Sequence, residues 1–191
     1  MQTPSHLIMS AALGIPMRKR GLTVSKTGLL LGAVLPDVPF TLLTIGYTLY
    51  YRITGISVPA PSVMEYLHFD LFFTDPVWII SHNTPHSLVV NGLLMLLGWV
   101  WIRRGRSPFL FWLAASMMLH TTIDIFTHTS DGPLFLFPLN GSYRFISPIS
   151  YWESGAWFIT LEYAVDALLL VFIGRNWRIN RTQKGQHHVT T

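Results

Sequence analysis

Long apolar stretches run through most of this chain, interrupted by basic, polar or Gly- and Pro-rich segments. Their lengths predict helices over 4–16, 22–35, 39–52, 87–102, 108–127 and 154–174. Pro16 and Pro36 are expected to end the first two helices, because proline lacks the backbone N–H that a helix interior needs. Residues 54–66 and 129–151 are rich in turn-forming residues and are expected to be loops, with a shorter aromatic segment over 68–80.

The composition indicates a membrane protein. Half of the 191 residues are hydrophobic and 12% are charged, whereas soluble domains carry about 25% charged residues. A chain this short cannot hide so much apolar surface from water. We therefore predict an all-α, polytopic membrane helical bundle with several short or half-membrane helices, and the lipid bilayer as its partner. One membrane-embedded domain is expected over 1–176, followed by a basic polar tail over 177–191 that is expected to be disordered.

Lys and Arg gather in three segments, which are 18–26, 103–106 and 175–184. Positive residues favour the cytoplasmic side of a membrane, so these segments are predicted to be cytoplasmic in a protein integral to the inner membrane. The formal net charge of +4 then reflects topology, and no nucleic-acid partner is expected. When the helices are paired as hairpins, several His and Asp residues fall at the opposite, non-cytoplasmic end.

Two pairs of ionisable residues lie in or beside apolar runs. His82 and His86 precede one run and His120 and Asp124 lie inside another, each pair spaced i,i+4 so that a helix places both on one face. Ionisable groups at membrane depth are costly without partners, and imidazole with carboxylate suits zinc. Because the chain has no cysteine, a metal must use nitrogen and oxygen ligands. Pro85 disfavours a regular helix across the first pair.

Both pairs also have a structural interpretation. His82 and His86 could be ordinary polar residues at the start of a helix, and His120 and Asp124 could form a hydrogen bond that ties helices together. Asp37 fits a helix cap as well as a ligand. Glu162 and Asp166 share a face of the last helix, where they either orient a ligand histidine or pair with an Arg or each other.

The predicted topology nevertheless brings six candidate metal ligands to one level, which are His6, Asp37, His82, His86, His120 and Asp124. His128 and Asp131 lie in the turn that follows the last two, and they are candidates for proton transfer. With more than four candidate ligands, one or two divalent ions are expected, the two-ion case having a separation of about 3.5–4 Å.

The order of these elements resembles the YdjM-like family of bacterial inner-membrane-associated predicted metal-dependent hydrolases. The resemblance rests on His6, Pro36-Asp37, the His82–Ser87 element HNTPHS, the His120–Asp124 element HTTID, and Gly132-Pro133. The segment SPISYWE over 147–153 also resembles a motif of some members. Family members commonly carry Arg where this chain has Asn83. If that Arg contacts an anionic substrate, this chain differs in substrate or activity.

The resemblance implies a metal site and, with it, hydrolysis of an ester or phosphoester. Lipids are among the candidate substrates. Two other functions fit the same residues. A transporter would use the His and Asp groups to bind a passing ion or relay protons, and would conduct ions in liposomes. A structural protein would use them only to bond helices, and would bind no metal.

Overall fold

The computed structural model describes residues 1–151 and 153–187, and in them it contains helices and no strand. The elements are α1 (Thr3–Lys19), α2 (Lys26–Val34), the 3₁₀ turn η1 (Leu35–Asp37), α3 (Val38–Thr54), α4 (Val63–Glu65), the π-helical η2 (Tyr66–Leu71), α5 (Phe72–Thr74), α6 (Pro76–Asn83), α7 (Leu88–Arg103), α8 (Phe109–Thr127) and α9 (Ala156–His187). The all-α prediction is confirmed.

Three helical stretches of the described chain are long and apolar enough to cross a membrane, namely 26–54, 109–127 and 156–182. The bent pair α6 and α7 adds a fourth if it is counted as one span. Large apolar side chains on these stretches face outward, among them Leu42 on α3, Leu93 on α7 and Leu168 on α9. Exposing such large apolar patches to water is unfavourable, so these surfaces face lipid and the bundle is a polytopic membrane protein.

The prediction that Pro36 ends a short helix is wrong in one respect. α2, η1 and α3 follow one another without a loop and form one helical stretch of 29 residues. Pro36 lies in the first turn of η1, where a missing N–H costs little. The stretch is roughly 44 Å long at 1.5 Å per residue, longer than the about 30 Å hydrocarbon core. Asp37 therefore lies within a membrane-length stretch and not at its end.

Pro16 does not end α1 either, because the helix continues to Lys19. Its carbonyl still accepts a hydrogen bond from the N–H of Arg20 at 3.1 Å. The two basic residues of the last turn, Arg18 and Lys19, suit the negative end of the helix dipole. At 17 residues α1 is still a short helix, as predicted.

His82 and His86 do not share one regular helix. α6 ends at Asn83 and α7 begins at Leu88, with a bend of 43° between them. Ser87 caps α7 by accepting a hydrogen bond from Val90 N at 3.1 Å. His86 therefore lies in the break, although its ring still stacks on that of His82 at 4.3 Å.

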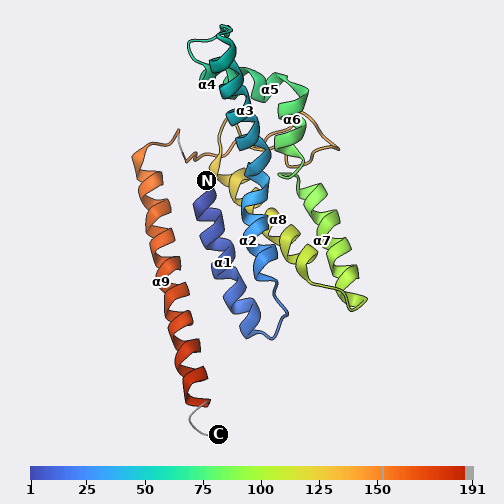
Figure 1. Cartoon of the computed structure of the whole chain (residues 1–191), viewed down its shortest axis with the longest axis vertical. Helices are drawn as coiled ribbons and strands as arrows, with labels where there is room; N and C mark the ends of the chain where they lie inside the picture. Colours follow the sequence, from blue (N-terminus) through green and yellow to red (C-terminus); the bar gives the residue numbers. More distant parts are fainter. Residues whose placement is uncertain (152, 188–191) are drawn as a thin grey trace.

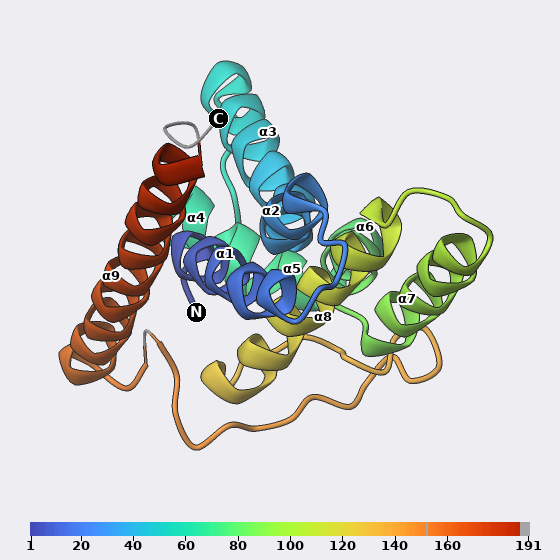
Figure 2. The same ribbon diagram turned by 90° about the horizontal axis from the view of Figure 1, so that it is seen from below.

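The helices pack side by side, with α1, α2 and α8 in the middle (Figure 1). Seen from below, α9 packs against α1 on one side and α7 packs against α8 on the other (Figure 2). The α1–α2 turn, the α7–α8 turn and the end of α9 all lie at the lower end in Figure 1. The basic segments 18–26, 103–106 and 175–184 lie at those places in the chain.

Two glycines one turn apart let α2 approach α8 closely. A Cβ on Gly28 would lie 2.7 Å from the carbonyl oxygen of Phe109, and one on Gly32 would lie 2.2 Å from that of Leu113. Small residues at this spacing are the usual means by which membrane helices bring their backbones together. Ser116 on α8 then donates a hydrogen bond to the carbonyl of Leu29 at 2.7 Å. This hydrogen bond fixes the position of α8 along the axis of α2.

Residues 128–151 and 153–155 contain no α-helix, as predicted for 129–151, and form the crossing loop at the upper end of the bundle. Their backbone bonds the helix ends, since Leu88 N donates to Phe135 O at 2.8 Å and Tyr151 N donates to Thr127 O at 3.0 Å. α9 then runs to His187, beyond the predicted end at 174 and into the predicted tail. Residues 188–191 of that tail lie outside the described residues.

Candidate metal centre

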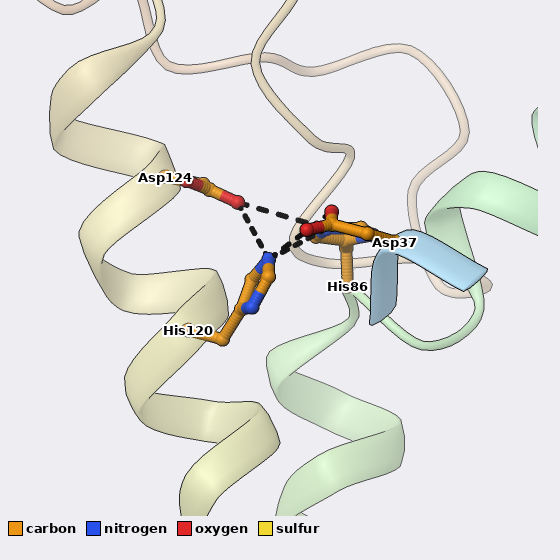
Figure 3. Close-up of side chains that lie close together, drawn as sticks. All are labelled: Asp37, His86, His120 and Asp124. Atoms are coloured by element: carbon orange, nitrogen blue, oxygen red, sulfur yellow. Dashed lines mark hydrogen bonds and ion pairs between the residues drawn. The ribbon is translucent and has the colours of Figure 1, made fainter. Parts of the chain in front are cut away.

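Four of the six predicted ligands meet at one place. Asp37, His86, His120 and Asp124 each offer an oxygen or nitrogen atom, and these atoms all lie within 4.8 Å of one another. Asp37 comes from η1, His86 from the break between α6 and α7, and the other two from α8. Figure 3 shows the four side chains pointing into a shared space. Both histidines and Asp124 are buried, and Asp37 is partly exposed.

The hydrogen bonds of the two histidines orient them for metal binding. Nδ1 of His86 lies 2.8 Å from the carbonyl oxygen of His82, and Nδ1 of His120 lies 2.8 Å from that of Ala33. A carbonyl can only accept, so both Nδ1 atoms carry the hydrogen. In the neutral rings Nε2 then has a free lone pair, and the two Nε2 atoms lie 3.3 Å apart. Such bonds to Nδ1 are typical around metal-ligating histidines.

The two carboxylates complete the donor set. Oδ2 of Asp124 lies 2.9 Å from His120 Nε2 and 3.6 Å from His86 Nε2. Oδ1 of Asp37 lies 3.4 and 3.6 Å from the same two nitrogens. Two imidazole nitrogens and two carboxylate oxygens fit a divalent ion such as zinc, which takes four N or O ligands in protein sites.

The other oxygen of Asp124, Oδ1, contacts three nitrogen atoms outside the four-residue cluster. Oδ1 lies 3.0 Å from His6 Nε2, 3.5 Å from His128 Nε2 and 2.9 Å from the Met1 amine. The ring of His6 stacks on that of His120 at 3.7 Å. One carboxylate therefore joins the four-residue cluster to a neighbouring group of nitrogens.

His128 and Asp131 form a bonded pair beside the cluster, with Nδ1 and Oδ1 3.0 Å apart. Burial alone would lower the pKa of His128, but its hydrogen bonds with Asp124 and Asp131 outweigh burial and raise it. Burial alone would raise the pKa of Asp131, but the hydrogen bond and the charge of His128 act together with smaller contributions to lower it. The Tyr151 ring lies 4.9 Å from that of His128. Burial and nearby carboxylates raise the pKa of Tyr151 to about 12, so its phenol is neutral at neutral pH.

His82 lies next to the four-residue cluster but outside it. Its ring stacks on His86, and both of its ring nitrogens are buried without a hydrogen-bond partner. His82 therefore contributes its backbone carbonyl to the orientation of His86, and its ring faces the cavity described below.

Several contacts at the site have no counterpart in the predicted residue set. The hydroxyl of Thr3 donates to Oδ2 of Asp37. The amine of Met1 bonds Asp124, and it also lies 3.0 Å from the hydroxyl of Thr127. The only sequence signal for Tyr151 is its place in the segment SPISYWE. Threonine and a chain terminus are too common to be recognised as site residues from sequence.

Asn83, at the position where the resemblance led us to expect an Arg, is fully buried and ties α6 to the crossing loop. Its amide nitrogen donates to Ile79 O at 2.8 Å, and its oxygen accepts from Leu134 N at 2.7 Å. Asn83 does not line the cavity at the site.

Glu162 and Asp166 on α9 bond α1 and not a ligand histidine. Oε1 of Glu162 accepts from Gln2 N at 2.9 Å and lies 2.7 Å from the Ser5 hydroxyl oxygen. Oδ2 of Asp166 lies 2.6 Å from the same hydroxyl oxygen. These bonds differ from the predicted roles, which were the orientation of a histidine and pairing with an Arg or each other. The pair instead holds the start of α1, next to His6.

A cavity of about 540 Å³ opens beside the cluster. Its polar lining includes Asp37, His86, Asp124, His128 and Asp131. Its aromatic lining includes Phe40, Phe69, Phe72 and Phe73, with the rings of His68 and His82 in contact with Phe40 and Phe72. The volume falls within the usual range for small-molecule sites.

Comparison with known families agrees with the order of motifs along the chain. A family model described as YdjM inner membrane protein matches residues 1–184. The chain belongs to this family. No curated protein and no solved structure gives a significant match. The family's description indicates the inner membrane, which agrees with the apolar spans of the bundle.

Proposed function

We propose that this protein is a membrane-bound, metal-dependent hydrolase that acts on an ester or phosphoester. The observation that carries the proposal is the cluster of Asp37, His86, His120 and Asp124 at the edge of the cavity. A purely structural set of polar groups would need neither two Nε2 atoms facing each other at 3.3 Å nor an adjoining space for a small molecule.

The four-residue cluster would hold zinc. The second oxygen of Asp124 lies next to the Nε2 atoms of His6 and His128. These three atoms would be the ligands of a second ion. Zinc bound here would lower the pKa of a bound water towards about 7 and polarise the scissile group.

The residues of this chain would bind and orient the substrate and protonate the leaving oxygen. In hydrolysis the water oxygen bonds to the acyl carbon or phosphorus, the bond to the leaving oxygen breaks, and a water proton ends on that oxygen. His128 lines the cavity, and Asp131 holds its Nδ1 at 3.0 Å. We assign the proton transfer to this pair.

The orientation is also part of the proposal. The three basic segments would lie in the cytoplasm, and the cluster would lie within the membrane, towards the ends of α1 and α8 that face away from these segments. The cavity includes groups from the cluster and the crossing loop at that end, and none of its lining residues belongs to the basic segments. This one-sided placement favours an enzyme over a transporter.

The test is metal analysis together with hydrolysis by detergent-purified protein. The wild type should retain zinc and hydrolyse phosphate or carboxylic esters, and His120→Ala should lose both properties. Asp70→Ala is the control, because Asp70 is exposed and does not line the cavity. Unchanged zinc content in His120→Ala would remove the basis of the proposal, and ion flux in liposomes without hydrolysis would replace it with transport.

A further inference from the structure

The cavity has an aromatic wall that ester hydrolysis by itself does not require. Phe40, Phe69, Phe72 and Phe73 form this aromatic wall, and they come from α3, η2 and α5. Phe40 contacts Phe72 edge to face at 5.7 Å and Phe72 contacts Phe73 at 4.8 Å, so these three rings pack together. A small polar ester would gain nothing from it.

The aromatic wall continues to the outer surface of the protein. Phe69 is 59% exposed and Phe73 is 37% exposed although both line the cavity. Leu42 on α3 and Ile80 on α6 are also exposed, on helices next to the wall. Because Phe40 of the wall lies on α3, which belongs to a membrane-length stretch, we infer that the aromatic wall borders the surface that lipid chains cover.

A cation lies beside the same wall. The guanidinium carbon of Arg144 is 5.3 Å from the ring centre of Phe72 and 5.2 Å from that of Phe73. Arg144 is half-buried and donates to the carbonyl of Gly132. Arg144 does not itself line the cavity, but it brings a positive charge next to two rings that do, and this charge favours an anionic phosphate over a neutral ester.

We propose, on the basis of the proposed function, that the substrate is an amphiphilic phosphate ester carried in the membrane. Its apolar chain lies against Phe69 and Phe73, and its phosphoester reaches the cluster of Asp37, His86, His120 and Asp124. Hydrolysis joins a water oxygen to phosphorus and breaks the bond from phosphorus to the alcohol oxygen. The water proton passes to that alcohol, and no other reactant is needed.

The first experiment compares a long-chain phosphatidic acid, its short-chain analogue and glycerol phosphate as substrates of the zinc-loaded full chain in micelles. The double variant Phe69→Ser/Phe73→Ser should lower kcat/KM for the long chain by about tenfold or more relative to kcat/KM for glycerol phosphate. The control is Phe126→Ser/Phe172→Ser, since these side chains are 55% and 40% exposed but do not line the cavity. An unchanged chain preference in the first variant overturns the inference while the hydrolase stands.

The second experiment does not depend on turnover. Phosphatidic acid with a photoreactive group in its chain is placed in phosphatidylethanolamine and phosphatidylglycerol vesicles that contain the protein. Crosslinks should concentrate in residues 66–74, and Phe69→Ser/Phe73→Ser should reduce them severalfold. Equal labelling of 66–74 and of the outer face of α9 overturns the inference. If no ester is hydrolysed while the crosslinks still concentrate there, the proposed hydrolase fails and the lipid site remains.

Discussion

His120 and Asp124, one turn apart on α8, hold Nε2 and Oδ2 at 2.9 Å from each other. The same carboxylate places its other oxygen 3.0 Å from His6 Nε2. Asp124 is therefore the residue through which both groups of candidate ligands are connected.

Replacement of Asp124 by Asn should separate metal binding from proton transfer. Asp124→Asn keeps the side-chain volume but removes the negative charge, so zinc retention should fall more than tenfold. Asp131→Asn should leave zinc in place and lower the rate of hydrolysis by about 10²–10⁴-fold, because His128 loses its charged partner. Zinc content and kcat measured on both variants check this. Equal zinc loss in the two variants would contradict the division of roles.

Removal of the Glu162 carboxyl should loosen the start of α1. Glu162→Ala leaves the N–H of Gln2 without its partner, which costs about 1–3 kcal/mol in the free energy of unfolding. Zinc affinity should fall with it, because Thr3 and His6 lie on the same first turns. Glu162→Gln keeps an acceptor and should restore most of the affinity. Thermal unfolding and zinc titration give the measurement, with the exposed Glu65→Ala as the control; an Ala variant identical to wild type would refute the role.

A methyl group on Gly32 should push α8 away from α2. The added Cβ would lie 2.2 Å from Leu113 O and 2.8 Å from the Ser116 side chain, and such overpacking costs about 1–3 kcal/mol. Gly32→Ala should therefore lower Tm and weaken zinc retention, because the carbonyl of the next residue, Ala33, orients His120. Gly46→Ala meets no atom within 4 Å and should leave Tm unchanged or slightly higher. If both variants unfold at the same temperature, the close packing of α2 and α8 is not needed.

Single cysteines should report the orientation, since the chain has none of its own. Ser107→Cys lies in the α7–α8 turn and Ser142→Cys in the crossing loop, and both positions are exposed. A membrane-impermeant maleimide applied to intact spheroplasts should label position 142 and spare position 107 until the membrane is opened. The reverse pattern would place the cluster on the cytoplasmic side.

The sequence was sufficient to predict the helical bundle and to include all four residues of the cluster in a set of six candidate ligands. His120 and Asp124 interrupt an apolar run, and their spacing alone fixes their common face on a helix. The helices were recognisable because long apolar runs between basic turns are typical of membrane spans. A water-soluble protein of this size would not have a hydrophobic core large enough to bury them.

The remaining contacts depend on tertiary structure. Pro36 reads as a helix end, yet it lies in a first-turn position of η1, so Asp37 falls within a continuous helical stretch. His82 and His86 have chelate spacing, but the bend of 43° leaves only His86 in the four-residue cluster. The bond from Thr3 to Asp37 and those from α9 to Ser5 join residues far apart in the chain, and no local pattern records such pairs.

The order of the cluster residues along the chain sets the order in which they meet during synthesis. Asp37 and His86 leave the ribosome before α8, which carries His120 and Asp124. An ionised group left at membrane depth costs about 2.5–3.5 kcal/mol on the insertion scale. Insertion of α8 against Gly28 and Gly32 is then the step that relieves this cost, so a ribosome-bound chain truncated before α8 should remain associated with the insertion machinery.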